Sequence, residues 1–311
     1  MGTGGDSHST FNISTTASII ASPLLMIAKH GNRAQTSLSG SADVLMSLSP
    51  KAPNLSNPTS ENLAQVYYQT NYAFLFAPNF HSGMKHAAQV RRELGLRTIF
   101  NLMGPLANPV DWALEVRLVG VAYQELGPIF AEALGLSGAK KALVVCGQED
   151  LDEISCAGKT NCWMWREVPN EKFKDSGRDE DDVTSDDDAE PEFNYELETF
   201  QLHPSDFGLP SHPLSEVGGG KLPKENAAKL MSILRNELPP DDPILDFVLM
   251  NTAALLAISG VLEGDDHQGE EVIKERGPGG CMWKEGVRKA RWCIETGRAL
   301  QELEKFIDFT N

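Results

Sequence analysis

The stretch GTGGD at residues 2–6 opens a run of three small-residue turns, followed by NIST at residues 12–15 and KHGNR at residues 29–33. Glycine has no Cβ, so the backbone of GTGGD can take left-handed dihedral angles and approach a ligand closely. Successive main-chain N–H groups in such a turn form a concave anion site. Three such turns within 33 residues predict one anion pocket built from several loops.

Residues 14–29 alternate small and apolar side chains and predict a buried helix, although Pro23 favours a kink or a break within it. The first amides of this helix, from Ser14 to Ala17, would be free to bind phosphate. Most short glycine clusters are plain turns, so GTGGD by itself indicates phosphate binding only weakly. The case for a site depends on its neighbours.

The middle of the chain predicts an α/β architecture with a parallel sheet. The runs at residues 114–122 and 142–146 are rich in β-forming residues, and a short helix is expected between them at residues 128–134. In such a unit the binding site lies at the carboxyl ends of the strands. Asp152 and Glu153 come a few residues after the second strand, where paired carboxylates suit Mg²⁺. Taken alone, the pair is more simply read as solvated surface charge.

The remaining pattern is mainly helical and is expected to support the core. The apolar run at residues 243–260, with Pro243 in its first turn, predicts a central buried helix. A second polar insertion is expected at residues 265–280. Other helices are predicted at residues 39–48 (with a serine as N-cap), from residue 61, and at residues 82–94, 225–238 and 283–307.

Acidic residues are concentrated in one segment. The 311-residue chain has a net charge of −17 and is 41% hydrophobic, enough for one large domain plus a smaller lobe. Between residues 175 and 198 lie twelve acidic residues and one basic residue, a net charge of −11, which leaves −6 elsewhere. This segment predicts a disordered acidic insertion at about residues 170–198, with a partner-binding or metal-buffering tail as the alternative. The charge argues against nucleic-acid binding.

The five cysteines form no CxxC pair and are odd in number, so free thiols in a reducing compartment are preferred to a zinc site. No apolar run approaches the ~18 residues that span a bilayer. The first residues are polar, unlike a signal peptide. These features predict a cytoplasmic protein that does not bind membranes.

Six motifs follow one another along the chain: GTGGD, TFNIST, KHGNR, SGSADVL, MKHAAQVRRELGLRTIFNLMGPLANP (residues 84–109) and LDEIS (residues 151–155). The same order is found in the anthranilate phosphoribosyltransferase family, which this chain resembles. The resemblance implies an α/β fold of the nucleoside phosphorylase/phosphoribosyltransferase type, with a central mainly parallel sheet and a partial small helical lobe. It divides the chain into a phosphate-binding part of the α/β domain (1–56), a segment of the helical lobe with the hinge (57–105), and the rest of the α/β domain (106–311).

The same resemblance implies a transfer of phosphoribosyl from phosphoribosyl pyrophosphate to the amine of anthranilate, with Mg²⁺ as cofactor. Mg²⁺ would be held through Ser14, Asp152 and Glu153, and it would stabilise the charge of the departing pyrophosphate. The residues implied for phosphoribosyl pyrophosphate are Gly2, Gly5, Asp6, Thr10, Asn12, Ile13, Ser14, Thr15, Lys29, Ser37 and Ser41.

The acceptor site implied by the resemblance consists of Gly2, Asn32 and Arg91, with the guanidinium of Arg91 facing the anthranilate carboxylate. Without the family, Arg91 is one solvated arginine on a helix surface. His30 and His86 are interpreted as packing or capping residues and receive no catalytic role. The amine of anthranilate is neutral at pH 7, so no general base is assigned.

One departure from the family pattern concerns the beginning of the chain. The family has several helices and a strand before GTGGD, which supply most of the small lobe and much of a homodimer interface. A fungal-like member without these helices, from an incomplete gene model or a truncated form, is therefore expected. Two alternatives stay open: a pyrimidine nucleoside phosphorylase of the related fold, whose loop should carry a lysine soon after its glycines, and an inactive truncated remnant.

Overall fold

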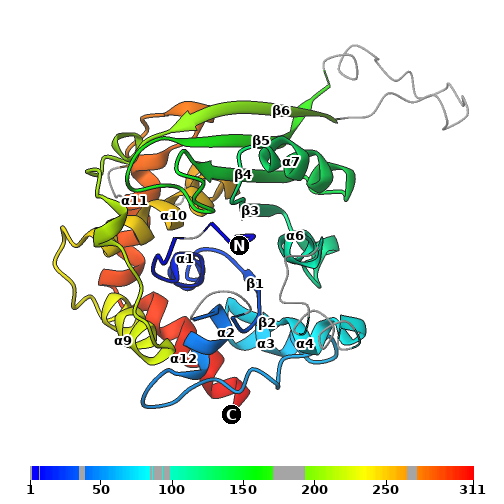
Figure 1. Ribbon diagram of the computed structural model, residues 1–311, viewed down its shortest axis with the longest axis vertical. Helices are drawn as coiled ribbons and strands as arrows, with labels where there is room; N and C mark the ends of the chain where they lie inside the picture. The colour runs from blue at the N-terminus through cyan, green and yellow to red at the C-terminus, as the bar shows by residue number, and fades with distance from the viewer. Residues whose placement is uncertain are drawn as a thin grey trace, which may run out of the picture.

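The computed structural model describes residues 2–6, 8–34, 39–84, 86, 93, 99–170, 193–264 and 272–311, and these form an α/β fold (Figure 1). The strands are β1 (Ile27–Gly31), β2 (Tyr72–Phe76), β3 (Val116–Gly120), β4 (Lys141–Gly147), β5 (Thr160–Pro169) and β6 (Phe193–Leu202). The α-helices are α1 (Ile13–Ala21), α2 (Ser41–Met46), α3 (Leu63–Gln69), α4 (Ala77–Phe80), α6 (Ile99–Leu106), α7 (Leu126–Leu136), α9 (Pro223–Leu234), α10 (Pro243–Ser259), α11 (Trp283–Glu295) and α12 (Arg298–Thr310). The short 3₁₀ helices are η1 (Ser82–Met84), η2 (Asp111–Ala113), η4 (Pro204–Phe207), η5 (Leu214–Glu216), η6 (Val261–Glu263) and η7 (Pro278–Gly280).

The strands form two sheets. Strands β1 and β2 pair in parallel, with Ile27 opposite Tyr72. The second sheet has the order β3-β4-β5-β6, in which β3 and β4 are parallel and are connected by α7. Strands β5 and β6 extend this sheet by antiparallel pairing. The α/β fold and the predicted β3-α7-β4 unit are confirmed.

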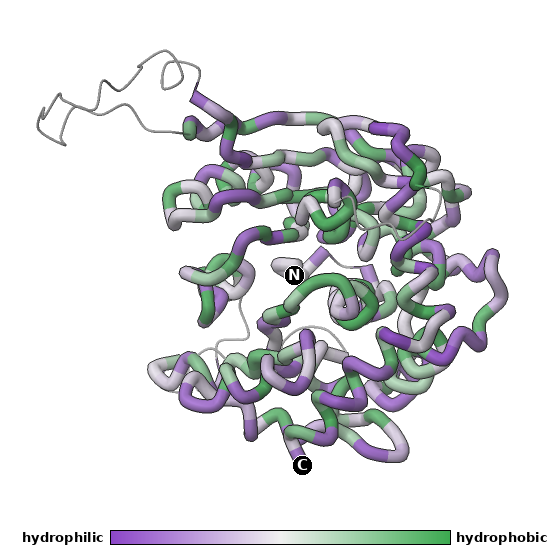
Figure 2. Tube along the Cα trace, turned by 180° about the vertical axis from the view of Figure 1, so that it is seen from behind, coloured by the Kyte–Doolittle hydropathy of each residue, from purple (hydrophilic) through white to green (hydrophobic). Residues whose placement is uncertain are grey.

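The N-terminal segment lies between the two sheets, as both views of the chain show (Figures 1 and 2). Gly2 forms a parallel bridge with Gly120, the last residue of β3. Helix α1 then runs through the centre of the molecule and contacts β1, α10, α11 and α12. The segment that carries GTGGD is therefore tied to the core from both sides.

The predicted central helix is confirmed as α10. Fourteen of its 17 residues are buried, and Asp242 caps its first turn by accepting hydrogen bonds from the amides of Ile244 (2.9 Å) and Leu245 (3.1 Å). Two hydrophobic clusters flank the larger sheet, one around α1 and α10 and one beneath α7. The core thus fixes the carboxyl ends of β1, β3 and β4 relative to α1 and α10.

Three expectations about helices were wrong. Helix α1 ends at Ala21 rather than continuing to Lys29, because Pro23 interrupts it and β1 follows. The long C-terminal helix is two helices, separated where Gly297 takes a left-handed φ of 70°. Helix α2 has Gly40, not a serine, as its N-cap, with its amide donating to the Asp43 carboxylate (3.1 Å).

Some of the predictions fall outside the described residues. These are most of the helix expected at residues 82–94 and residues 171–192 of the acidic insertion, together with residues 265–271 of the second insertion. The expected disorder was wrong for residues 193–198, which belong to β6 and pair with β5. All five cysteines are free, as expected, and four of them are buried. In the part of the chain that the structure describes, no helix combines the length and the hydropathy needed to span a membrane.

Candidate active site

The glycine loop (residues 2–6) turns at the carboxyl end of β3. The Thr3 amide donates to the Gly120 carbonyl oxygen (2.9 Å), and the Thr3 hydroxyl accepts from the Ala122 amide (3.2 Å). Gly4 and Gly5 have left-handed φ angles of 68° and 79°. A side chain at either position would be strained. The loop therefore points main-chain groups, rather than side chains, away from the sheet.

The acidic loop (residues 148–159), which carries Asp152 and Glu153, lies directly against the glycine loop. The Gly4 amide donates to Asp152 Oδ2 (2.6 Å). A Cβ at Gly2 would lie 2.0 Å from the same carboxylate oxygen, and a Cβ at Gly120 would lie 1.7 Å from the Asp152 carbonyl oxygen. Two motifs about 150 residues apart thus form a single site, with no room for a side chain between them.

The beginning of α1 completes one wall of this site. Asn12 is its N-cap residue, and the Asn12 side-chain amide donates to the Ser39 carbonyl oxygen (3.2 Å) rather than capping the helix. The Thr16 amide donates to the Asn12 carbonyl oxygen (3.2 Å), so Thr16 is not among the free amides expected from the sequence. The Ser14 amide hydrogen-bonds with the Glu153 carboxylate. The first turn of α1 therefore faces an anion, as the helix dipole favours.

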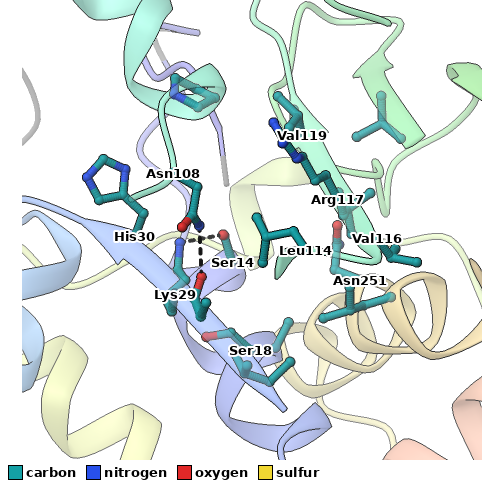
Figure 3. A pocket seen from close by; sticks show the side chains of 18 of the residues that line it. Ser14, Ser18, Lys29, His30, Asn108, Leu114, Val116, Arg117, Val119 and Asn251 are labelled. Atoms are coloured by element: carbon teal, nitrogen blue, oxygen red, sulfur yellow. Dashed lines mark hydrogen bonds between the residues drawn. The ribbon is translucent and has the colours of Figure 1, made fainter. Parts of the chain in front are cut away.

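Lys29 of β1 places a buried ammonium group beside the acidic pair. Its side-chain nitrogen donates to Ser14 Oγ (3.0 Å), and only 8% of the residue is exposed (Figure 3). Burial lowers the pKa of Lys29 to about 8, against the attraction of Glu153 and Asp152. The ammonium group thus lies beside the first turn of α1 and close enough to the acidic pair to be attracted by it.

Burial and nearby negative charge raise the pKa of both carboxyl groups. Burial, followed by repulsion from Glu153 and Asp6, raises the pKa of Asp152 well above its usual range. Burial raises the pKa of Glu153 to about 7. A site with several close carboxylates and one lysine lacks positive charge, and hard oxygen donors suit a cation such as Mg²⁺.

The described residues contain no group of three or more His, Cys, Asp or Glu side chains that could hold a metal ion. This does not argue against Mg²⁺, because that ion keeps several water molecules and binds through one or two carboxylates plus phosphate oxygens. The donors Asp152 and Glu153, with the hydroxyl of Ser14 next to them, meet this requirement.

The loop after β1 carries two further predicted residues. The Asn32 carbonyl oxygen accepts from the Ser41 hydroxyl (3.3 Å) and from the Ala42 amide (3.2 Å). A Cβ at Gly31 would lie 2.5 Å from Ser41 Oγ. Asn32 and Ser41 are therefore neighbours at the carboxyl end of β1. Ser37 and Arg91 lie outside the described residues.

Other predicted residues contribute through the main chain. The side chains of Ile13 and Thr15 are buried, and the Ile13 amide already donates to the Phe11 carbonyl oxygen (2.7 Å). Thr10 is half-buried and forms an antiparallel bridge with Gly218. Asp6 accepts from the His8 amide (3.2 Å) and lies close enough to repel Asp152.

A cavity of about 140 Å³ is lined by residues of β1 and β3 (Figure 3), and Glu153 also belongs to its wall. Sequence reasoning did not single out four polar residues in its walls, namely Ser18, Asn108, Arg117 and Asn251. The Asn108 side chain donates to the Ala28 carbonyl oxygen (3.1 Å). Arg117 is buried and pairs with Asp111. Asn251 could have been noticed as a polar residue within an apolar helix.

His30 lies in the cavity wall with a neutral ring. Its Nδ1 contacts the Gly104 carbonyl oxygen (3.3 Å), and its ring lies 5.0 Å from that of His81 in an edge-on arrangement. Burial lowers the pKa of His30 to about 4, and repulsion from His81 adds to this effect. The sequence reading of His30 as a packed residue agrees with this burial.

Comparison with known proteins gives a consistent picture. The family model described as the glycosyl transferase family, a/b domain, matches residues 1–175 and 173–300. The chain is 41% identical over 307 residues to anthranilate phosphoribosyltransferase from Schizosaccharomyces pombe, covering 98% of the chain and 72% of that protein. It is 37% identical over 314 residues to the enzyme of the same name from Saccharomyces cerevisiae, covering 99% of the chain and 70% of that protein.

Solved structures agree with these relatives. The Saccharomyces cerevisiae enzyme in complex with PRPP and Mg superposes with a TM-score of 0.77 at 35% identity, covering 99% of this chain and 71% of that chain. The same enzyme in complex with 4-fluoroanthranilate gives a TM-score of 0.73 at 34% identity, with the same coverage. The Thermus thermophilus enzyme gives 0.71 at 31% identity, covering 99% of this chain and 76% of that chain.

Proposed function

Because the chain belongs to the glycosyl transferase family and, within it, to the anthranilate phosphoribosyltransferases, we propose that it transfers a 5-phosphoribosyl group from phosphoribosyl pyrophosphate to anthranilate. The bond from the anomeric carbon to the pyrophosphate oxygen breaks, and a bond to the anthranilate nitrogen forms. The products are N-(5-phosphoribosyl)anthranilate and pyrophosphate, and one amine proton passes to solvent. The observation that carries this proposal is the contact between Gly4 and Asp152, which joins the glycine loop to the acidic loop.

The pyrophosphate is held mainly by main-chain amides. The amides proposed to bind it belong to the left-handed glycine loop and the first turn of α1, and the ammonium group of Lys29, next to Ser14, supplies the positive charge. The full proposed set for phosphoribosyl pyrophosphate is Gly2, Gly5, Asp6, Thr10, Asn12, Ile13, Ser14, Thr15, Lys29, Ser37 and Ser41.

The proposed Mg²⁺ ligands are Asp152, Glu153 and Ser14. The two carboxylates lie on the acidic loop, and the Ser14 hydroxyl lies at the start of α1, where it already accepts from Lys29. When bound, Mg²⁺ supplies the positive charge that stabilises the leaving pyrophosphate. The Gly4 amide donates to Asp152 and helps to hold its carboxylate in place.

The acceptor binds across the same space through Gly2, Asn32 and Arg91. Anthranilate carries a carboxylate next to a neutral amine, so the site needs a cation for the carboxylate and no base for the amine. Asn32 lies at the carboxyl end of β1, where its main chain is held by α2. The nucleophile is thereby oriented rather than activated.

The wider assignments stay proposals. The chain is proposed to act in the cytoplasm, and as a homodimer where the N-terminal helices of the family are present, with an α/β domain at residues 1–56 and 106–311 and a helical-lobe segment at residues 57–105. The pyrimidine nucleoside phosphorylase alternative would require a lysine soon after the glycine loop, and this sequence has none there. An inactive remnant is the other alternative, and a measurement of turnover distinguishes it from an active enzyme.

The experiment follows the loss of anthranilate fluorescence after phosphoribosyl pyrophosphate and Mg²⁺ are added to the purified chain. The double variant Asp152→Asn/Glu153→Gln should lose turnover. The matched control Glu237→Gln/Asp241→Asn, which neutralises two exposed acids, should keep it. Turnover in the parent and control alone supports the proposal. A folded parent without turnover would reject this 311-residue chain as a working enzyme, and phosphorolysis of a pyrimidine nucleoside would favour the alternative.

A further inference from the structure

Asn251 is a buried amide in the middle of the apolar helix α10, and it contacts the acidic loop directly. Only 2% of the residue is exposed. Its Oδ1 accepts from the Ile154 amide (3.0 Å), and its Nδ2 donates to the Ile154 carbonyl oxygen (3.2 Å). We propose that Asn251 is a positioning residue, which holds the Asp152–Glu153 pair in place by binding both main-chain groups of the next residue. This inference rests on the metal site proposed above.

The amide of Asn251 is itself fixed. Its Nδ2 also donates to the Phe247 carbonyl oxygen one turn earlier in α10 (3.0 Å), so both of its N–H groups and its oxygen have partners. Rotation of the side chain would break three hydrogen bonds at once in a largely buried place. The helix therefore presents a rigid donor and acceptor to the loop.

The acidic pair is held on both sides. On one side, Asp152 accepts from the Gly4 amide (2.6 Å). On the other side, Ile154 is clamped by Asn251, and its side chain is buried. Glu153 lies between these two attachments, and its carboxylate accepts from the Ser14 amide, so neither carboxylate can turn away without loss of a hydrogen bond.

Such a clamp is needed because the acidic loop holds negatively charged groups close together. Asp152, Glu153 and Asp6 repel one another, and without other restraints this repulsion would spread the carboxylates apart. Hydrogen bonds from the Gln148 amide to the Lys159 carbonyl oxygen (3.0 Å), and from the Ser155 amide to the Thr160 hydroxyl (2.8 Å), hold the loop near its base. Asn251 is the attachment made by α10 next to the carboxylates. Partners that orient metal ligands in this way commonly affect metal affinity.

The neighbouring residue offers a matched control. Thr252 is fully buried in the same helix, and its hydroxyl donates to the Val248 carbonyl oxygen (2.8 Å) within α10. It is therefore a buried polar group whose hydrogen bond stays inside the helix. Thr252→Val should disturb α10 without disturbing the acidic loop.

The test measures Mn²⁺ binding by the full chain in the presence of saturating phosphoribosyl pyrophosphate, from the loss of the free-ion electron paramagnetic resonance signal. Asn251→Asp keeps the size and the acceptor but loses both donors. It should weaken Mn²⁺ binding by about ten-fold or more. Thr252→Val should leave the affinity unchanged, and urea unfolding should establish that both variants are folded. Should Asn251→Asp not fold, Asn251→Ser, which keeps a short hydroxyl, replaces it.

The outcomes separate this inference from the proposed function. Unchanged Mn²⁺ affinity in the Asn251 variant, or an equal loss in Thr252→Val, would overturn the positioning role and leave the metal site standing. Retained Mn²⁺ binding in Asp152→Asn/Glu153→Gln would instead overturn the proposed metal site, and the role of Asn251 with it. A higher Mg²⁺ requirement with an unchanged KM for anthranilate is the kinetic result expected of the Asn251 variant.

Discussion

Acid should destabilise this protein through His30, a buried histidine in the cavity wall. Its folded-state pKa of about 4 lies below the usual value of 6.5, because burial disfavours the charged ring. The unfolded chain therefore binds a proton at this residue more readily than the folded chain does. The stability associated with the neutral ring is fully present above pH 6.5 and is lost as the pH falls towards 4.

The size of the effect follows from the two pKa values of His30. With 6.5 in the unfolded state and about 4 in the folded state, the free energy of unfolding should fall by about 2 kcal/mol between pH 7.5 and pH 5, and by about 3 kcal/mol near pH 4. His30→Gln removes this contribution. Between pH 7.5 and pH 5, the free energy of unfolding of the variant should therefore fall by about 2 kcal/mol less than that of the parent.

Urea unfolding at pH 7.5 and pH 5.0, followed by tryptophan fluorescence, measures for each variant how much the free energy of unfolding changes between the two pH values. His81→Gln is the matched control, since it removes the repulsion from the neighbouring ring but leaves the burial of His30, which is the larger cause of its low pKa. It should reduce the acid sensitivity less than His30→Gln does. If the parent and His30→Gln lost the same free energy between the two pH values, the reasoning would be refuted.

Three further variants test the packing of the site and its helices. Gly120→Ala should lower the free energy of unfolding by about 1–3 kcal/mol, because its Cβ would lie 1.7 Å from a carbonyl oxygen of the acidic loop; Gly158→Ala, with nothing within 4 Å, should be near neutral in the same urea titration. Asp242→Ala removes the N-cap of α10 and should cost about 1 kcal/mol in thermal unfolding, whereas the exposed neighbour Asp241→Ala should cost little. Lys29→Met should raise the KM for phosphoribosyl pyrophosphate about ten-fold. It should not reduce the free energy of unfolding at pH 7, because the buried ammonium group has a pKa of about 8 and is therefore costly to keep charged. A loss of stability with an unchanged KM would contradict this prediction.

Local features of the fold could be predicted from the sequence. The glycines of the glycine loop require left-handed angles that other residues rarely adopt, and Gly4 and Gly5 do adopt them. Helix α10 was recognisable from its length, its continuous apolar character and Pro243 in its first turn. In both cases the signal lies within a few consecutive residues, so no knowledge of distant contacts was needed.

Elements that depend on distant partners were missed. Strand β2 is short and buried throughout, and its sequence YAFLF fits a helix as well as a strand until its pairing with β1 is known. Strands β5 and β6 alternate weakly, and β6 carries acidic residues that seemed to belong to the acidic insertion. The break between α11 and α12 at Gly297 was readable in principle, since a glycine in an amphipathic helix commonly marks its end.

The same distinction explains which part of the candidate site could be found. The metal-binding role of Asp152 and Glu153 was implied by the family resemblance, because two adjacent carboxylates after a strand would alone be read as solvated charge. Their contact with the glycine loop depends on Gly2 and Gly120, whose missing side chains leave room for Asp152. Asn251 is the reverse case. A lone amide in an apolar helix indicates a buried polar partner, because an unpaired amide there would be costly, but nothing in the helix itself identifies Ile154, 97 residues away, as that partner. From sequence, a polar residue of this kind therefore indicates that a buried hydrogen-bond partner exists. The identity of that partner, and the site that the contact supports, follow only from the fold.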